Sequence, residues 1–146
     1  MLLKIKNLNF KYPDKEIFSS FDLQAPGGKI IHINGPSGAG KTTLLHLIAG
    51  IQSPQSGAIT LGEEVFFNND QELLIEERRV GLVFQDYALF PHLNAINNIS
   101  FGNKNITEEK INTTLNQLDI HKLKNKYPEE ISGGQQQRVA IARTVL

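Results

Sequence analysis

The residues that could do chemistry are concentrated in one glycine-rich stretch that matches the pattern GxxxxGK[ST]. Its glycines allow the backbone to curl so that successive N–H groups point at phosphate oxygens. Lys41 would reach the β- and γ-phosphates as a mobile charge, and the Thr42 hydroxyl would bind Mg²⁺. The stretch therefore predicts a site for a nucleoside triphosphate. Its residues are Gly35, Pro36, Ser37, Gly38, Ala39, Gly40, Lys41 and Thr42, followed by Thr43.

A second unusual sequence, Ser132-Gly133-Gly134-Gln135, lies near the end of the chain. Ser132 is suited to cap a helix, and Gln135 can return a hydrogen bond to the backbone N–H of Ser132. The two glycines leave this helix end free of side chains, so it too could receive a phosphate oxygen. Considered alone, the same residues are explained equally well by a well-capped helix that binds nothing.

The composition is that of an ordinary folded domain, with 146 residues, 40% of them hydrophobic and 21% charged. Fifteen basic residues balance fifteen acidic ones, which disfavours nucleic acid as a partner. The absence of cysteine excludes disulfide and thiolate chemistry. The sequence has neither the run of roughly 18 apolar residues of a membrane span nor a secretory signal. We expect one domain, or a core with a small second lobe, and at most a peripheral membrane role.

The elements that must position the glycine-rich stretch begin with two predicted strands, residues 3–12 and 17–23, joined around Pro13 and Asp14 as an antiparallel pair. Residues 29–34 form a short apolar run typical of a strand that is buried on both faces of a parallel sheet. This strand, the glycine-rich stretch and a helix are therefore expected in immediate succession. Further strands are predicted at residues 58–61 and 80–84, and a polar surface connection between them at residues 68–70.

Helices are predicted where apolar residues recur at helical spacing. The helix after the glycine-rich stretch would end at Gly50, and residues 94–101 would form a second helix. Thr107 and Ser132 would cap two further helices, and Pro128 would break the helical pattern between them. The residues expected on the buried faces are Leu44, Leu47, Ile48 and Ile51 in the first helix, Ile111, Leu115 and Leu118 in the third, and Val139, Ala142, Val145 and Leu146 in the last.

In combination and order, these motifs resemble the nucleotide-binding subunit of ATP-binding-cassette transporters, over essentially all 146 residues. Gln85 is similar to the family's metal- and water-contacting glutamine, and residues 132–136 resemble its signature sequence. Tyr12 resembles the aromatic residue that stacks on adenine. The run from residue 84 to 93 is most like importer ATPases for molybdate, sulfate, maltose or polyamines, with the molybdate type nearest.

The resemblance implies an α/β fold with a P-loop NTPase core and N-terminal antiparallel strands in residues 1–86, and a small helical subdomain in residues 87–146. It implies that the chain binds ATP and Mg²⁺, with catalytic roles for Lys41 and Gln85 and metal ligation by Thr42 and Gln85. It also implies a head-to-tail dimer, in which residues 132–135 close over the ATP of a second ATP-binding subunit. Transmembrane permease subunits at the cytoplasmic face of the membrane would be further partners.

Two of these residue assignments have alternatives in the sequence itself, and one apolar cluster has two interpretations. Asp86, rather than Gln85, could end an aliphatic strand as the magnesium-binding acid. Tyr12 could be a turn residue that packs on Pro13. The apolar cluster Leu89, Phe90 and Leu93 could be a partner-docking surface or a small local core.

The chain departs from the family after the signature helix, because it ends at Leu146, before the family's aliphatic strand with Asp-Glu and its later histidine. None of the four histidines, His32, His46, His92 and His121, lies in the matching place. We therefore expect a truncated chain that binds ATP but does not hydrolyse it efficiently. We also expect residues 30–33 to have a bare edge or an exposed face.

Two other functions fit parts of the pattern. A cassette ATPase of the DNA-repair or chromosome-organising type would carry a long coiled coil or a zinc module between Gln85 and Ser132, whereas this chain has a short connection and no cysteine. A non-catalytic nucleotide-binding module remains compatible with the sequence.

Overall fold

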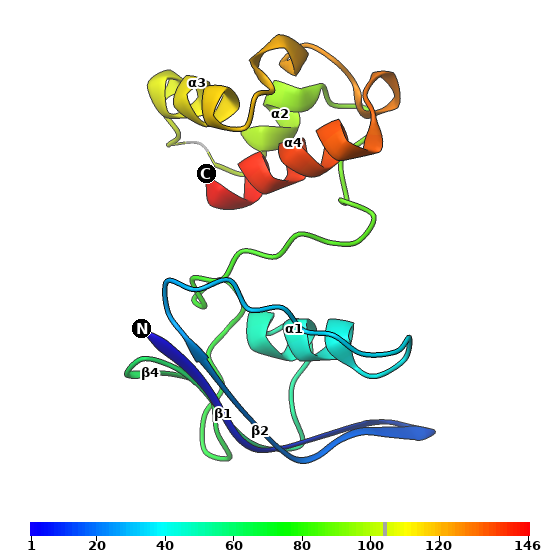
Figure 1. Cartoon of the computed structure of the whole chain (residues 1–146). Helices are drawn as coiled ribbons and strands as arrows, with labels where there is room; N and C mark the ends of the chain where they lie inside the picture. The colour runs from blue at the N-terminus through cyan, green and yellow to red at the C-terminus, as the bar shows by residue number, and fades with distance from the viewer. Residues whose placement is uncertain (104) are drawn as a thin grey trace. The chain divides into compact units, whose positions relative to one another are not determined.

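The computed structural model describes residues 1–103 and 105–146, which form two compact units, Met1–Val80 and Gly81–Leu146. Figure 1 gives the order of the elements along the chain. The first unit contains the sheet and one helix, and the second is helical. The expected α/β class, with antiparallel strands at the N-terminus and a separate helical part, is confirmed.

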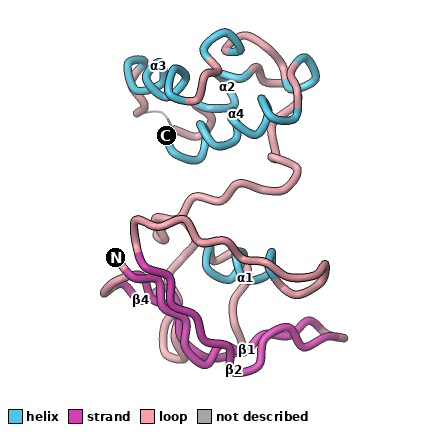
Figure 2. The backbone as a smooth tube through the Cα atoms, in the orientation of Figure 1, coloured by secondary structure: helices cyan, strands magenta, loops and turns pink. Residues whose placement is uncertain are grey.

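The sheet of the first unit is antiparallel throughout and has the order β2-β1-β3-β4, drawn in magenta in Figure 2. A tight turn at Pro13 and Asp14 joins the first two strands, so that Tyr12 pairs with Lys15 and the predicted hairpin is confirmed. The fourth strand was not predicted. The bounds are β1 Leu2–Tyr12, β2 Lys15–Pro26, β3 Ser56–Leu61 and β4 Glu64–Phe67.

Helix α1 (Lys41–Ala49) packs its apolar face on this sheet. Gly50 follows it with φ +84°, a conformation that glycine adopts without strain, and thereby ends the helix as predicted. Ile51 lies beyond that end and is 40% exposed, so its expected place on the buried face was wrong. The core of this unit comprises Ile5, Leu8, Phe10, Phe18, Leu44, Leu47, Ile48, Ile59, Phe66 and Phe67.

Two predicted strands, residues 29–34 and 80–84, do not form in the described part of the chain. A parallel strand needs hydrogen-bonding neighbours, and in the described part of the chain none of the four strands pairs with either segment. Both segments are extended coil instead. Ile30 is fully exposed and Ile31 is 45% exposed, as we expected for an unpaired segment, whereas Ile33 packs against the core.

In the residues that the structure describes, the second unit packs three α-helices and two short 3₁₀ helices around its own core. Side-chain oxygens of Asn94, Thr107 and Ser132 cap the three α-helices, so the predicted caps at the last two are confirmed. Val145 is 61% exposed and was wrongly predicted to face inward. The bounds are α2 Ala95–Ile99, α3 Glu108–Gln117, η1 His121–Leu123, η2 Pro128–Glu130 and α4 Gly133–Val145.

Within the residues that the structure describes, no helix is long and apolar enough to cross a lipid bilayer.

Candidate functional site

The glycine-rich loop leads directly into the first turn of α1. Gly38 and Gly40 have φ values of +78° and +90°, which L side chains rarely adopt. A Cβ at Gly40 would also lie 2.5 Å from Cγ2 of Ile17 and 3.1 Å from Cζ of Phe18. The residue before α1 must therefore be glycine both for its conformation and for its close approach to β2.

The start of α1 differs from the starts of the other α-helices. Gly40 occupies the N-cap position, and no side chain caps the helix there, whereas α2, α3 and α4 each begin with a capping side chain. The first N–H groups of a helix carry partial positive charge and need acceptors. The first turn of α1 therefore presents N–H donors that the described residues do not cap with a side chain.

Lys41 lies over the loop that precedes it. Its Nζ donates to the carbonyl oxygen of Gly35 at 2.8 Å and to that of Pro36 at 2.7 Å. The Nζ of Lys15 donates to the carbonyl oxygen of Gly38 at 3.0 Å, so two ammonium groups lie against this loop. An ammonium has three N–H donors, which leaves Lys41 one donor for a further acceptor.

Tyr12 and Thr43 are brought into contact by the structure, with 3.3 Å between the phenol oxygen and Oγ1. The amide of Gln52 lies against the same phenol, with Nε2 at 3.0 Å and Oε1 at 3.2 Å. Hydrogen bonds from Thr43 and then from Gln52 lower the pKa of the Tyr12 phenol below its ordinary value. The Thr43 side chain is buried, whereas Thr42 is exposed and available for a metal ion.

A second candidate site lies at the start of α4, in the other unit. Ser132 Oγ accepts a hydrogen bond from the N–H of Gln135 at 3.4 Å, and Gln135 Oε1 accepts one from the N–H of Ser132 at 2.9 Å. This is the reciprocal capping pattern that the sequence predicts. Among the described residues, no atom lies within 4 Å of a Cβ built on Gly133 or Gly134, so the approach to this helix end is open.

Gln85 opens an exposed turn at residues 85–88 rather than closing a strand. Asp86, the alternative metal ligand, accepts a hydrogen bond from the N–H of Ala88 at 3.2 Å within this turn. Tyr87 and Ala88 have φ values of +64° and +44°, an unusual conformation for residues other than glycine. The turn is therefore a strained connection that other groups must hold.

Arg143 is one of these groups, and sequence analysis did not identify it. From the last turn of α4, its guanidinium donates to the carbonyl oxygens of Ala88 at 2.7 Å and Tyr87 at 3.0 Å. It also lies over the ring of Phe90, at 5.8 Å from the centroid. Partial burial lowers the pKa of Arg143. The helix that begins at Ser132 is thus bonded at its far end to the turn that follows Gln85.

Asn98 of α2 holds the next part of the same connection. It is fully buried, accepts from the N–H of Phe90 at 2.8 Å, and donates to the carbonyl oxygens of Phe90 at 3.1 Å and Leu93 at 2.8 Å. Leu89 packs against the core of this unit. The rings of Phe90 and Phe101 have centroids 4.3 Å apart and planes tilted by 42°, and Phe101 is 56% exposed. Residues 89–93 therefore combine a local core with an exposed aromatic edge.

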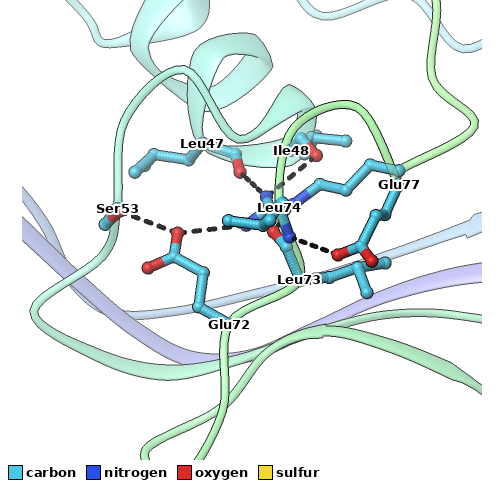
Figure 3. Close-up of polar contacts among 8 residues, drawn as sticks. Leu47, Ile48, Ser53, Glu72, Leu73, Leu74 and Glu77 are labelled. Atoms are coloured by element: carbon cyan, nitrogen blue, oxygen red, sulfur yellow. Dashed lines mark hydrogen bonds and ion pairs between the residues drawn. The ribbon is translucent and has the colours of Figure 1, made fainter.

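Arg78 is a further group that the sequence did not indicate. Figure 3 labels residues that contact it, among them Leu47, Ile48 and Glu72. The Arg78 side chain is buried, and its guanidinium donates to the carbonyl oxygens of Leu47 at 2.8 Å and Ile48 at 3.3 Å, in the last turn of α1. Nη2 forms an ion pair of 3.1 Å with Glu72. Burial lowers the pKa of Arg78, and Glu72 opposes this effect.

The proposed Mg²⁺ ligands are the Thr42 hydroxyl in the first unit and the Gln85 amide in the second. Hydroxyl and amide oxygens are hard ligands of the kind that Mg²⁺ accepts, together with phosphate and water. Among the described residues, no group of three or more His, Asp or Glu could hold a metal ion. The bare helix start and the glycine conformations before it fit a phosphate chain.

The chain belongs to the ABC transporter family, whose model matches residues 18–146. It is 36% identical to the sulfate/thiosulfate import ATP-binding protein CysA of Pectobacterium atrosepticum, over 100% of this chain and 46% of that protein. It is 39% identical to the Fe(3+) ions import ATP-binding protein FbpC 2 of Haemophilus influenzae, over 99% of this chain and 42% of the relative.

A further relative is the spermidine/putrescine import ATP-binding protein PotA of Marinobacter nauticus, which is 38% identical over 99% of this chain and 39% of its own length. The chain thus spans less than half the length of these curated relatives. Their names refer to sulfate, ferric ion and polyamines, so the expectation of molybdate has no support among them.

Proposed function

We propose that this chain binds ATP at residues 35–43 as the nucleotide-binding part of an ABC importer subunit. The observation that carries the proposal is the uncapped start of α1, which directly follows a loop held in glycine-only conformations. The ATP phosphates would accept hydrogen bonds from the N–H groups that no side chain caps. The names of the relatives, which are import ATP-binding proteins, support the same conclusion.

Lys41 would move from the loop carbonyl oxygens to the phosphates when ATP binds. An ammonium gains more from an anionic oxygen than from a neutral carbonyl, because charge-assisted hydrogen bonds are about twice as strong. Thr42 would ligate Mg²⁺ through its exposed hydroxyl, and Gln85 would approach the metal and the water from its exposed turn. Bound Mg²⁺ would neutralise charge on the β- and γ-phosphates.

Ser132, Gly133 and Gly134 would contact the ATP of a second ATP-binding subunit in a head-to-tail dimer. Because Ser132 Oγ already accepts the Gln135 N–H, its own O–H proton is free to be donated to a phosphate oxygen. The two glycines leave room for that oxygen. Dimer formation would then depend on ATP, which supplies the acceptor.

Coupling to transmembrane permease subunits would use residues 87–93. Arg143 and Asn98 bond this segment to α4 and α2, respectively, so a force on the segment would be transmitted to the helix that begins at Ser132. The exposed ring of Phe101 beside Phe90 supplies apolar surface for a partner. The chain would then lie peripherally at the cytoplasmic face of the membrane.

The names of the relatives indicate a class of imported solute. The relatives are named for sulfate or thiosulfate, Fe(3+) and spermidine or putrescine, which are all small charged solutes. We propose import of a small charged solute, with ATP binding by this chain as one step of the cycle.

The test is the affinity for Mg-ATP of the chain and of Lys41→Ala, measured by isothermal titration calorimetry. We expect a loss of at least about tenfold, or ~1.4 kcal/mol, because the variant lacks the ammonium at the loop. The matched control is Lys6→Ala, which removes an exposed ammonium from β1 and should bind ATP as the parent chain does. Equal affinity of Lys41→Ala and the parent chain would refute the phosphate-loop assignment.

A further inference from the structure

The hydroxyl group of Tyr12 joins the end of β1 to both ends of α1. Tyr12 is the last residue of β1, Thr43 lies in the first turn of α1, and Gln52 lies two residues beyond Gly50, where that helix ends. All three side chains meet at the phenol oxygen, at distances of 3.0 to 3.3 Å. One aromatic side chain is thus fixed beside the helix that begins at the phosphate loop.

We propose that Gln52 is a positioning residue that, together with Thr43, holds the Tyr12 ring in the orientation needed to stack on the base of the bound nucleotide. This inference rests on the proposed function, because it presupposes a nucleotide at the loop. It goes beyond that function by assigning base recognition to a hydrogen-bonded group of three side chains.

The hydrogen-bonding capacities of the three groups are complementary. Gln52 Nε2 can donate to the phenol oxygen, and in the contact between the phenol and the Thr43 hydroxyl either oxygen can be the donor. The backbone of Gln52 is itself anchored, because its N–H donates to the carbonyl oxygen of His46 at 3.4 Å and the N–H of Ile51 donates to the same oxygen at 2.9 Å. The amide therefore starts from a fixed point when it reaches Tyr12.

The ring is restrained but not covered. Phe10 contacts it in an edge-to-face arrangement, with centroids 5.0 Å apart and planes at 89°. Tyr12 nevertheless remains 37% exposed, which leaves surface for a flat ligand. An aromatic ring that is already immobile loses less conformational entropy when a base stacks on it.

Immobilising a flexible side chain on binding weakens affinity by roughly two- to tenfold. A variant in which the Tyr12 ring has lost its hydrogen bonds should therefore bind ATP more weakly within that range. Phosphate binding should not change, because the loop and Lys41 remain intact. The comparison of Mg-ATP with Mg-tripolyphosphate, which has the phosphate chain but no base, therefore isolates the contribution of Tyr12.

The experiment measures both dissociation constants for the chain, for Gln52→Ala, for Tyr12→Phe and for the double variant. We expect each single variant to bind ATP about three- to tenfold more weakly and tripolyphosphate unchanged, with the double variant no weaker than Tyr12→Phe. The matched controls are Gln24→Ala on β2 and Tyr127→Phe in the second unit, which should leave both constants unchanged.

A spectroscopic measurement adds a readout that a general loss of stability would not give. Gln52 is one of the two residues that lower the pKa of the Tyr12 phenol. The phenolate absorbance of Tyr12, obtained as the difference from Tyr12→Phe, should titrate at higher pH in Gln52→Ala than in the parent chain.

Other results of the binding measurements would contradict the proposal. Unchanged ATP affinity in both single variants, or an equal loss for tripolyphosphate, overturns the positioning role. If the parent chain binds the two ligands equally, no base is contacted, and the inference fails while the phosphate site stands. If the parent chain binds neither ligand, the proposed function fails and the inference fails with it.

Discussion

Arg78 donates a hydrogen bond of 2.8 Å to the carbonyl oxygen of Leu47, so a buried guanidinium closes the end of the helix whose other end begins at the phosphate loop. The carbonyl oxygens at a helix C-terminus carry partial negative charge, and a cation there is favourable. The same guanidinium pairs with Glu72, which itself accepts from the Ser53 hydroxyl at 2.7 Å. The segment after β4 is thereby fastened to α1.

We expect Arg78→Met to lower the free energy of unfolding of the first unit by about 2–4 kcal/mol, because it leaves buried carbonyl oxygens without donors. Chemical denaturation followed by circular dichroism measures this change. The control is Arg79→Met, at the exposed neighbouring position, which should change stability by less than about 0.5 kcal/mol. Equal effects of the two variants would contradict the role of Arg78.

We expect Gly40→Ala to destabilise the first unit and to weaken ATP binding. The substitution forces φ +90° on alanine and places its Cβ against Ile17, which together cost about 2–4 kcal/mol. Gly28→Ala is the matched control, because Gly28 has φ +70° but no described atom within 4 Å of an added Cβ. Chemical denaturation should show a smaller loss for Gly28→Ala, and equal losses would contradict the close-packing argument.

We expect Asn98→Leu to destabilise the second unit by about 2–4 kcal/mol, because it removes the polar groups that satisfy the backbone of Phe90 and Leu93. The exposed neighbour Asn97 provides the control variant Asn97→Leu. Hydrogen exchange of the Phe90 amide measures the local effect, and protection that persists in Asn98→Leu would show that another group holds this segment.

Glu130 gives a prediction about pH. Its carboxylate accepts from the N–H of Tyr127 at 2.7 Å and lies 2.9 Å from Nζ of Lys126, and these hydrogen bonds lower its pKa below the usual range. A carboxyl group whose pKa is lower in the folded state stabilises that state at pH above its unfolded pKa of about 4.3, and the stabilisation is lost as pH falls through the folded pKa.

We therefore expect Glu130→Gln to melt at a lower temperature than the parent chain near neutral pH, with a difference that shrinks as pH falls below about 4.3 and is lost below the folded pKa of Glu130. Thermal unfolding of both chains across this range is the measurement. If the difference in melting temperature stays constant down to strongly acidic pH, its cause is the altered side-chain packing and not the lost charge of Glu130.

ATP hydrolysis by this chain can also be predicted. The 146 residues contain no Asp-Glu pair to polarise an attacking water. Because positioned acid–base groups contribute about 10²–10⁴-fold, we expect phosphate release by this chain to equal the buffer background while ATP still binds. Turnover above background that disappears in Asp86→Asn would instead assign the acid to Asp86.

Local features of the fold could be predicted from the sequence, whereas features that depend on distant residues could not. The capping of α4 by Ser132 and Gln135 uses residues three positions apart, and the sequence predicted it correctly. A strand at residues 29–34 requires neighbours that its own apolar pattern does not specify, and it does not form.

The same reasoning applies to the candidate site. The conformation of Gly40 follows from a motif, but the contact of Arg78 with Leu47 joins residues 31 positions apart through a backbone oxygen that has no sequence signal. Arg143 likewise reaches Ala88 across 55 positions. The sequence therefore predicted the groups that would touch ATP and missed those that hold them in place.

The uncapped start of α1 has a practical consequence for anyone who handles this chain. Sulfate and phosphate in a buffer are themselves tetrahedral oxyanions, and they would compete with nucleotide for the same donors. Titrations in such buffers would understate the true affinity, and a switch to chloride salts should increase the measured affinity.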